Sequence, residues 1–152
     1  MKVQSVIGAS ICLFAFTACI PPIPILTPKL YLHPVKGPIV SQYPNAAITG
    51  FTTGFGSGAI SFQSPNGESC NGAWELIPQN QSGSSLASCW DLVYGEGYFI
   101  KHVLGAKWRG NSKITGNQGS EFQLEFFRDT TKGAPLLGVA MDAAGNVYKV
   151  TQ

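Results

Sequence analysis

The sequence has few charged side chains, and this scarcity excludes several classes of protein. Charged residues make up 12% of the 152 residues, and ten basic side chains accompany eight acidic ones. So small a net charge creates no strong field that would steer a nucleic acid toward the protein. Histidine is also scarce, since His33 and His102 are the two in the chain, and a metal site needs His or Cys partners at ligand spacing. We therefore expect no metal and no nucleic-acid partner.

The familiar catalytic motifs are also missing. No serine lies in a Gly-x-Ser-x-Gly turn, and His102 has no evident triad partners. Glu121 and Glu125 would lie about 13 Å apart on one strand, whereas paired glycosidase carboxyls lie roughly 5 to 9.5 Å apart. They are more simply the solvated face of an amphipathic strand. Residues 53–58 (TGFGSG) are not followed by the Gly-Lys-Ser/Thr of a phosphate loop, and their glycines are expected to let a backbone or the Trp74 ring pack closely. We expect no cofactor and no catalytic residues.

The N-terminal residues have the pattern of a secretory signal peptide. Lys2 provides one positive charge, and an uncharged, largely apolar run follows as far as Ala18. The run is shorter than the about 20 apolar residues that a membrane-spanning helix needs, and Ser and Gly interrupt it. Thr17 and Ala18 then precede Cys19, which resembles the lipobox of bacterial lipoproteins.

This resemblance implies that the chain is cut before Cys19 and that the cysteine is acylated. Residues 1–18 would then be a lipoprotein signal peptide, and the protein would be anchored to a membrane of the bacterial cell envelope. Ile20 follows the cysteine where inner-membrane lipoproteins have Asp, so the outer membrane is favoured. The alternative is an ordinary signal peptide that ends near a cysteine.

Residues 19–44 contain most of the prolines of the chain and two charged residues, Lys29 and Lys36. Because proline lacks a backbone donor and fixes φ, we expect this segment to stay out of sheets and helices. Fully extended, it would reach on the order of 75 Å from the lipid. The sequence thus predicts a lipidated proline-rich tether, followed by one folded domain over residues 45–152.

The pattern of residues 45–152 is typical of antiparallel β structure. Short apolar runs lie between turn residues, and within residues 121–127 (EFQLEFF) Phe122, Leu124 and Phe126 alternate with polar side chains. We expect a mainly β domain, built as a small antiparallel sheet, a sandwich or a partly open barrel. Residues 84–94 differ, because apolar side chains recur there at helical spacing and Gly95 provides a stop. They are predicted to form one short helix.

The cysteines fit an exported protein. Cys12 would leave with the signal peptide and Cys19 would carry lipid, so Cys70 and Cys89 remain. Two such cysteines in an oxidising compartment form a disulfide by default. Closing this loop would contribute about 3 kcal/mol in the chain-entropy model.

Several segments resemble a widespread group of bacterial exported proteins and lipoproteins. The group shares a Gly-Glu-x-Cys-x-Gly-x-Trp-like start and a closing Asp-x-x-Gly-Asn-x-Tyr-Lys/Arg hairpin. The segments that carry the resemblance are GESCNGAW (67–74), WDLVYGEGYFIKHVLGAKWRG (90–110), ITGNQGSEFQLEFF (114–127) and GVAMDAAGNVYKV (138–150). The resemblance supports export and a β fold and implies no activity, because the group is known mainly as proteins of unknown function.

One segment is a candidate for ligand or partner contact. Within residues 101–113, expected to form a hairpin loop, basic side chains surround an indole: Lys101, Lys107, Trp108, Arg109 and Lys113. Basic groups beside an indole suit lipid headgroups, glycan strands or an acidic protein. The alternative is a solvated turn with Trp108 folded into the core.

Together these features predict a lipid-anchored, non-enzymatic protein of the cell envelope. Its partners would be the membrane, through the lipid on Cys19, and an envelope protein or glycan that it binds or stiffens. A second hypothesis is a secreted or periplasmic inhibitor or immunity protein. A third is a hydrolase whose catalytic groups are among His102, Glu68, Asp91 and Asp142.

Overall fold

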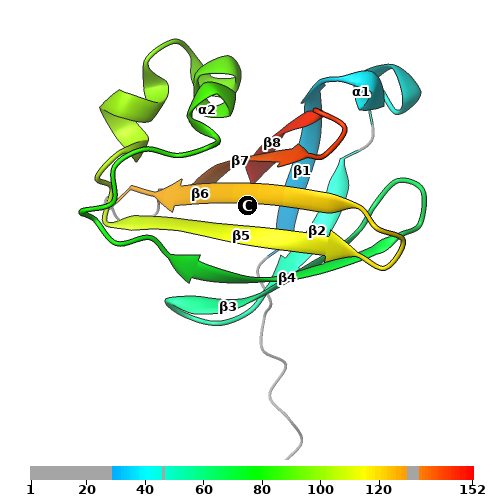
Figure 1. Ribbon diagram of the computed structural model, residues 1–152, viewed down its shortest axis with the longest axis horizontal. Helices are drawn as coiled ribbons and strands as arrows, with labels where there is room; N and C mark the ends of the chain where they lie inside the picture. The colour runs from blue at the N-terminus through cyan, green and yellow to red at the C-terminus, as the bar shows by residue number, and fades with distance from the viewer. Residues whose placement is uncertain (1–28, 46, 130–133) are drawn as a thin grey trace, which may run out of the picture.

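The structure, a computed structural model, describes residues 29–45, 47–129 and 134–152, which form a closed antiparallel β-barrel (Figure 1). The strands follow one another around the barrel in chain order, and the last pairs with the first. They are β1 (Lys29–Lys36), β2 (Ile48–Thr52), β3 (Ser57–Gln63), β4 (Ser69–Leu76), β5 (Trp108–Gly116), β6 (Glu121–Arg128), β7 (Leu136–Asp142) and β8 (Val147–Thr151). The prediction of a mainly β, antiparallel fold is confirmed, but the barrel is closed rather than partly open.

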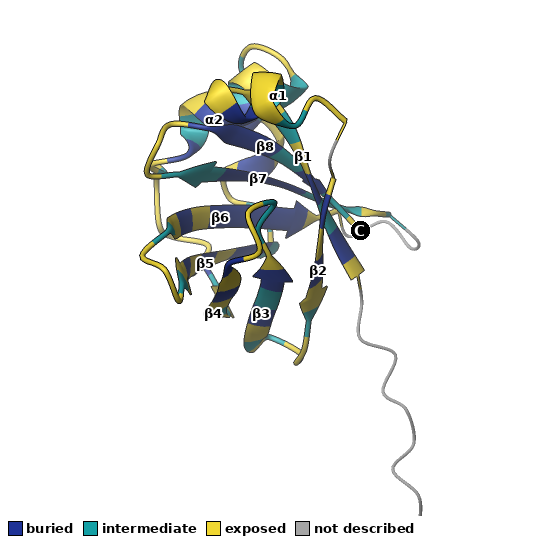
Figure 2. Cartoon of the chain, turned by 90° about the vertical axis from the view of Figure 1, so that its right-hand side faces the viewer, coloured by how far each residue is buried: buried dark blue, intermediate teal, exposed yellow. Residues whose placement is uncertain are grey.

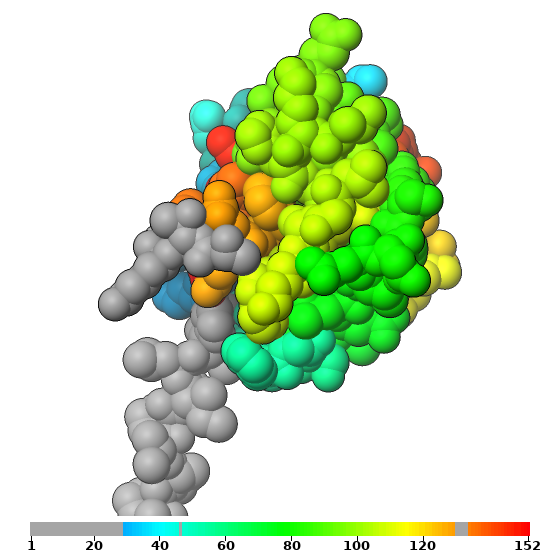
Figure 3. Space-filling view, turned by 90° about the vertical axis from the view of Figure 1, so that its left-hand side faces the viewer, coloured from blue at the N-terminus to red at the C-terminus, as the bar shows by residue number. Residues whose placement is uncertain are grey.

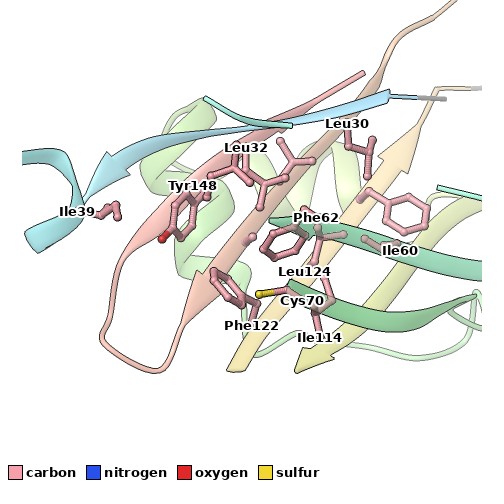
Figure 4. Close-up of a cluster of buried hydrophobic side chains, with 14 residues drawn as sticks. Leu30, Leu32, Ile39, Ile60, Phe62, Cys70, Ile114, Phe122, Leu124 and Tyr148 are labelled. Atoms are coloured by element: carbon pink, nitrogen blue, oxygen red, sulfur yellow. The ribbon is translucent and has the colours of Figure 1, made fainter. Parts of the chain in front are cut away.

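Side chains from all eight described strands fill the barrel interior (Figure 4). The alternation expected for residues 121–127 places Phe122, Leu124 and Phe126 inside, where they are at most 8% exposed. Phe122 packs edge-on against Phe62 from the opposite wall, with ring centroids 5.0 Å apart. An eight-stranded barrel is just wide enough for side chains to fill. The interior of this barrel is therefore a packed core.

A helical crossover between β4 and β5 covers part of the outer wall. It contains α2 (Ala87–Tyr94) and the short π-helix η1 (Phe99–Val103). Apolar side chains of these helices pack on β6, β7 and β8 and form a second core outside the barrel, centred on Trp90. The helix predicted over residues 84–94 is confirmed and ends at Gly95, whereas η1 was not expected.

The two ends of the barrel differ. At the capped end, the short helix α1 (Pro38–Gln42) inserts Ile39 into the interior core, and the turns 64–68, 117–120 and 143–146 lie around it. Figure 2 shows α1 above this end. At the opposite end, which we call the entry end, β1 begins next to the turn 53–56 and the loop 104–107. In the described part of the chain, no helix has the length and apolar character needed to cross a bilayer.

The predicted tether is wrong over its second half. Residues 29–36 form β1, which pairs with β2 through Lys29–Leu32 and with β8 from Tyr31 onward. Pro34 is tolerated because the pairing with β2 has already ended there, and a register shift with β8 follows it. The folded domain therefore begins before residue 45, and the signal peptide, Cys19 and the rest of the predicted tether lie outside the described residues.

The predicted disulfide is also wrong, because Cys70 and Cys89 are both free and buried. The alternation of β4 points Cys70 into the barrel interior, whereas Cys89 belongs to the core between α2 and the outer wall. The barrel wall separates the two clusters. Burial raises the pKa of both thiols above the ordinary value of 9.0.

Both thiols should therefore be unreactive in the folded protein. We expect an aromatic disulfide reagent to leave Cys70 and Cys89 unmodified at pH 8, because each is at most 4% exposed and protonated. In denaturant the same reagent should modify both cysteines. If the reagent did not modify the two cysteines in denaturant, they would be oxidised, and this would contradict their assignment as free thiols.

Candidate functional site

An open groove of about 800 Å³ lies on the outer wall of the barrel. Its floor is formed by β4, β5 and β6, and residues 77–86 of the crossover form one side. These three strands face the viewer in Figure 1. The side chains that give the groove its polar character are Ser57, Glu75, Gln81, Asn111, Lys113 and Gln123.

The exposed floor of the groove combines amides with one acid and one base. Asn111 of β5 lies opposite Glu75 of β4, and Lys113 lies opposite Gln123 of β6. All four are exposed. Amide side chains both donate and accept hydrogen bonds, and cross-strand neighbours lie about 4.5–5.5 Å apart. The floor therefore presents a regular array of neutral donors and acceptors with balanced charge.

A buried ion pair lies at the edge of this groove, under the crossover. Arg109 Nε donates to Glu125 Oε1 at 2.8 Å, and the two side chains are 3% and 5% exposed. The Arg109 Nη2 atom also donates to the Gly83 carbonyl, while Trp90 Nε1 and the Ser84 hydroxyl donate to the Glu125 carboxylate. A buried charge pair persists only when further hydrogen bonds satisfy it, and here they do. The pair fixes residues 83–90 to the barrel wall.

This pair corrects two predictions. Arg109 was a candidate contact residue, but its guanidinium is held inside the protein and lies 5.1 Å from the Phe99 ring centre. Glu125 was assigned to a solvated strand face, which holds for Glu121 but not for Glu125. Arg109 and Glu125 point outward from the barrel, and they are buried because the crossover covers them.

The remaining basic candidates do not form one loop. Lys101 lies on η1 and Lys107 precedes β5, and both line a smaller pocket of about 410 Å³ with His102 and Arg128. Lys113 lies further along β5, in the groove. The predicted hairpin loop over residues 101–113 is wrong, since η1 and the first half of β5 occupy it.

Trp108 is half-buried, and its contacts lie at the surface. Its ring contacts Phe55 with centroids 5.9 Å apart, and Lys107 Nζ lies 5.7 Å from its centre. It belongs to neither buried core. The alternative of a core indole therefore does not describe it.

The glycine-rich turn behaves as the sequence indicated. Trp74 Nε1 donates to the Thr53 carbonyl at 2.8 Å, across the turn between β2 and β3. A Cβ at Gly58 would lie 1.7 Å from that carbonyl oxygen and 2.8 Å from Trp74 Nε1. Gly58 is therefore required for the close approach of the Trp74 indole to the backbone.

The two motifs that carry the family resemblance have structural roles at the capped end. Glu68 accepts hydrogen bonds from Gln118 N at 2.7 Å, Ser120 N at 3.0 Å and the Ser120 hydroxyl, so it fixes the β5–β6 turn. Asp142 accepts from the Tyr148 hydroxyl at 2.9 Å and from two backbone N–H groups of its own turn. Sequence reasoning did not find these roles, although Asp followed by Gly-Asn is a turn signal.

The carboxylate of Glu68 should make stability depend on pH. The Ser120 hydroxyl and backbone N–H hold the pKa of Glu68 below its ordinary value of 4.5. A carboxyl with a lowered pKa stabilises the fold above the unfolded-state pKa, and this contribution is lost as the pH falls through the folded-state pKa. We expect Glu68→Gln to be less stable than the wild type at pH 7 and to lose less stability on acidification. Urea unfolding measured from pH 7 to pH 3 tests this, and parallel pH profiles would refute the role of Glu68.

The four residues of the hydrolase hypothesis occupy different places. Glu68 and Asp142 lie at the capped end, and Asp91 accepts a hydrogen bond from Phe99 N. The His102 ring is tilted against the Tyr98 ring, with ring centres 4.6 Å apart. Across the described ranges, no group of three or more His, Cys, Asp or Glu residues could hold a metal ion.

No family model, no curated protein and no solved structure matches this chain.

Proposed function

We propose that this chain is a lipid-anchored protein of the bacterial cell envelope that binds a glycan through the groove on β4, β5 and β6. The observation that carries the binding function is the polar groove of about 800 Å³ on an exposed, regular strand surface. The barrel interior supports the same assignment, because the protein's own side chains fill it. A ligand would therefore bind on the outer wall.

The chemistry of the groove favours a neutral, hydroxyl-rich ligand. Sugar hydroxyls donate and accept hydrogen bonds, as the Asn111 and Gln123 amides do. Glu75 and Lys113 balance each other in charge, and Arg109 is paired with Glu125. A polyanion would instead require a row of unpaired cations. An uncharged glycan strand of the envelope therefore fits better than a nucleic acid.

The anchor part of the proposal rests on Cys19 and its preceding Thr17-Ala18. The non-enzymatic part is supported by the roles of Glu68, Asp91 and Asp142, each of which accepts hydrogen bonds from backbone N–H groups of nearby turns. Carboxylates used in this way hold the fold together, which gives a structural role to three of the four residues that the hydrolase hypothesis names.

Co-sedimentation with purified peptidoglycan sacculi tests glycan binding. We expect the wild-type protein to sediment with sacculi and Asn111→Ala to bind roughly fivefold more weakly, since one hydrogen bond contributes about 1 kcal/mol. Asn71→Ala is the matched control, because Asn71 is an exposed asparagine of β4 that does not line the groove. Equal weakening by the two variants, or no sedimentation of the wild type, would overturn the proposal.

A further inference from the structure

The entry end of the barrel presents an exposed aromatic side chain on a rigid turn. Phe55 lies at the tip of the β2–β3 turn and is 90% exposed. Gly54 and Gly56 have φ values of 92° and 80°, and the Gly56 carbonyl accepts a hydrogen bond from Leu76 N. A Cβ at Gly54 would lie 2.0 Å from the Ser57 carbonyl oxygen. The turn is therefore built to hold this conformation, which exposes Phe55.

Other apolar side chains extend this surface. Trp108 contacts Phe55, and Figure 3 shows the segment that leads into β5 beside the β2–β3 turn. Phe51, at the end of β2, is 43% exposed, and Leu104, in the loop before β5, is 37% exposed. Water contact with several large apolar groups at one end of a small barrel is costly and marks an interaction surface.

Basic side chains accompany the apolar ones. Lys107 lies next to Trp108, and Lys101 and Arg128 line the adjoining pocket. Lys29 begins β1 opposite Phe51. Asp129 is the acidic residue of that pocket. Aromatic rings beside lysines are the combination found at the membrane–water interface, where the rings enter the headgroup layer and the cations contact anionic lipids.

The position of the anchor favours the membrane as the partner of this surface. Ten residue-to-residue steps lead from Cys19 to Lys29, and they span at most about 36 Å when fully extended. Lys29 pairs with Phe51, four residues before Phe55, so the chain enters the barrel at the end that carries the aromatic surface. A lipid on Cys19 therefore keeps this end close to the bilayer, and this step rests on the proposed function.

We propose that the entry end docks on an anionic phospholipid surface, with Phe55 and Trp108 in the headgroup layer and Lys29, Lys101 and Lys107 at its phosphates. The groove on β4, β5 and β6 runs along the side wall. Docking would fix the barrel upright on the membrane and hold the groove toward glycan beside the bilayer.

Quenching of tryptophan fluorescence by brominated lipids tests the docking. The lipidated mature protein is reconstituted in phosphatidylethanolamine–phosphatidylglycerol vesicles with and without bromine on the acyl chains. We expect brominated lipid to quench the wild type, Trp108→Phe to lose most of this quenching, and Phe55→Ser to reduce it strongly. Val35→Ser is the matched control, because Val35 is 43% exposed near the capped end and should leave quenching unchanged.

The outcomes separate the docking from the anchor. An acylated protein that brominated lipid does not quench, or that Phe55→Ser and Val35→Ser affect equally, overturns the docking while the anchor stands. A protein whose mass lacks acyl groups, but which binds and is quenched by added vesicles, overturns the anchor while the docking stands. Photo-crosslinking from position 55 to one discrete protein, without quenching, would assign the surface to a protein partner and overturn the proposal.

Discussion

Arg109→Ala should lower the free energy of unfolding by about 3–5 kcal/mol, the usual cost of removing one partner of a buried ion pair. The substitution leaves the Glu125 carboxylate buried, with Trp90 Nε1 and the Ser84 hydroxyl as its remaining donors. It also leaves the Gly83 carbonyl without its partner. We expect the crossover to loosen from the wall, and urea unfolding followed by circular dichroism measures the loss.

Two variants make this result specific. Lys113→Ala removes an exposed cation from the same strand and should change stability by less than about 0.5 kcal/mol. The double variant Arg109→Met/Glu125→Leu removes both charges, so its loss should be smaller than that of Arg109→Ala alone. For Arg109→Ala, a loss of unfolding free energy as small as that of Lys113→Ala would contradict a structural role for the Arg109–Glu125 pair.

Trp90→Ala should destabilise the protein by about 3–5 kcal/mol, as expected for removal of a fully buried tryptophan. The Trp90 ring lies 5.6 Å from Phe127, 5.4 Å from Tyr94 and 6.1 Å from Tyr98, so its loss opens a cavity in the outer core. Equilibrium unfolding in urea provides the measurement.

Trp90→Phe separates packing from hydrogen bonding. It keeps an aromatic ring in the core but loses the N–H that donates to Glu125 at 3.2 Å. We expect it to cost less than Trp90→Ala, by an amount that reflects the retained ring. Equal losses for the two variants would mean that the aromatic packing around Trp90 contributes little.

Much of the barrel could be predicted from local pattern, because strands with one buried face have a two-residue period. Residues 121–127 and the closing hairpin of β7 and β8 lie where the alternation and turn residues indicate. β1 is not predicted by this pattern, because proline disfavours sheet pairing and the segment is rich in proline. Pro34 occupies the part of β1 beyond the β2 ladder, and only long-range pairing reveals that position.

The site residues were harder to predict, because burial depends on what covers a strand from outside. The alternation of residues 121–127 indicates that Glu125 points away from the interior, but it does not show that the crossover covers Glu125 and Arg109. Cys70 and Cys89 illustrate the same problem, since a barrel wall separates two residues that a count of cysteines would pair. The exposure of Phe55 could not be predicted either. It depends on the φ angles of Gly54 and Gly56, which a sequence pattern does not give.

The intact mass of the native protein, extracted from membranes without reductant, tests the central claim most directly. We predict a chain that begins at Cys19, carries acyl groups and has the mass of two free thiols at Cys70 and Cys89. That result would place the entry end of the barrel within about 36 Å of a bilayer. An unacylated chain would contradict the anchor and leave a secreted or periplasmic protein in its place.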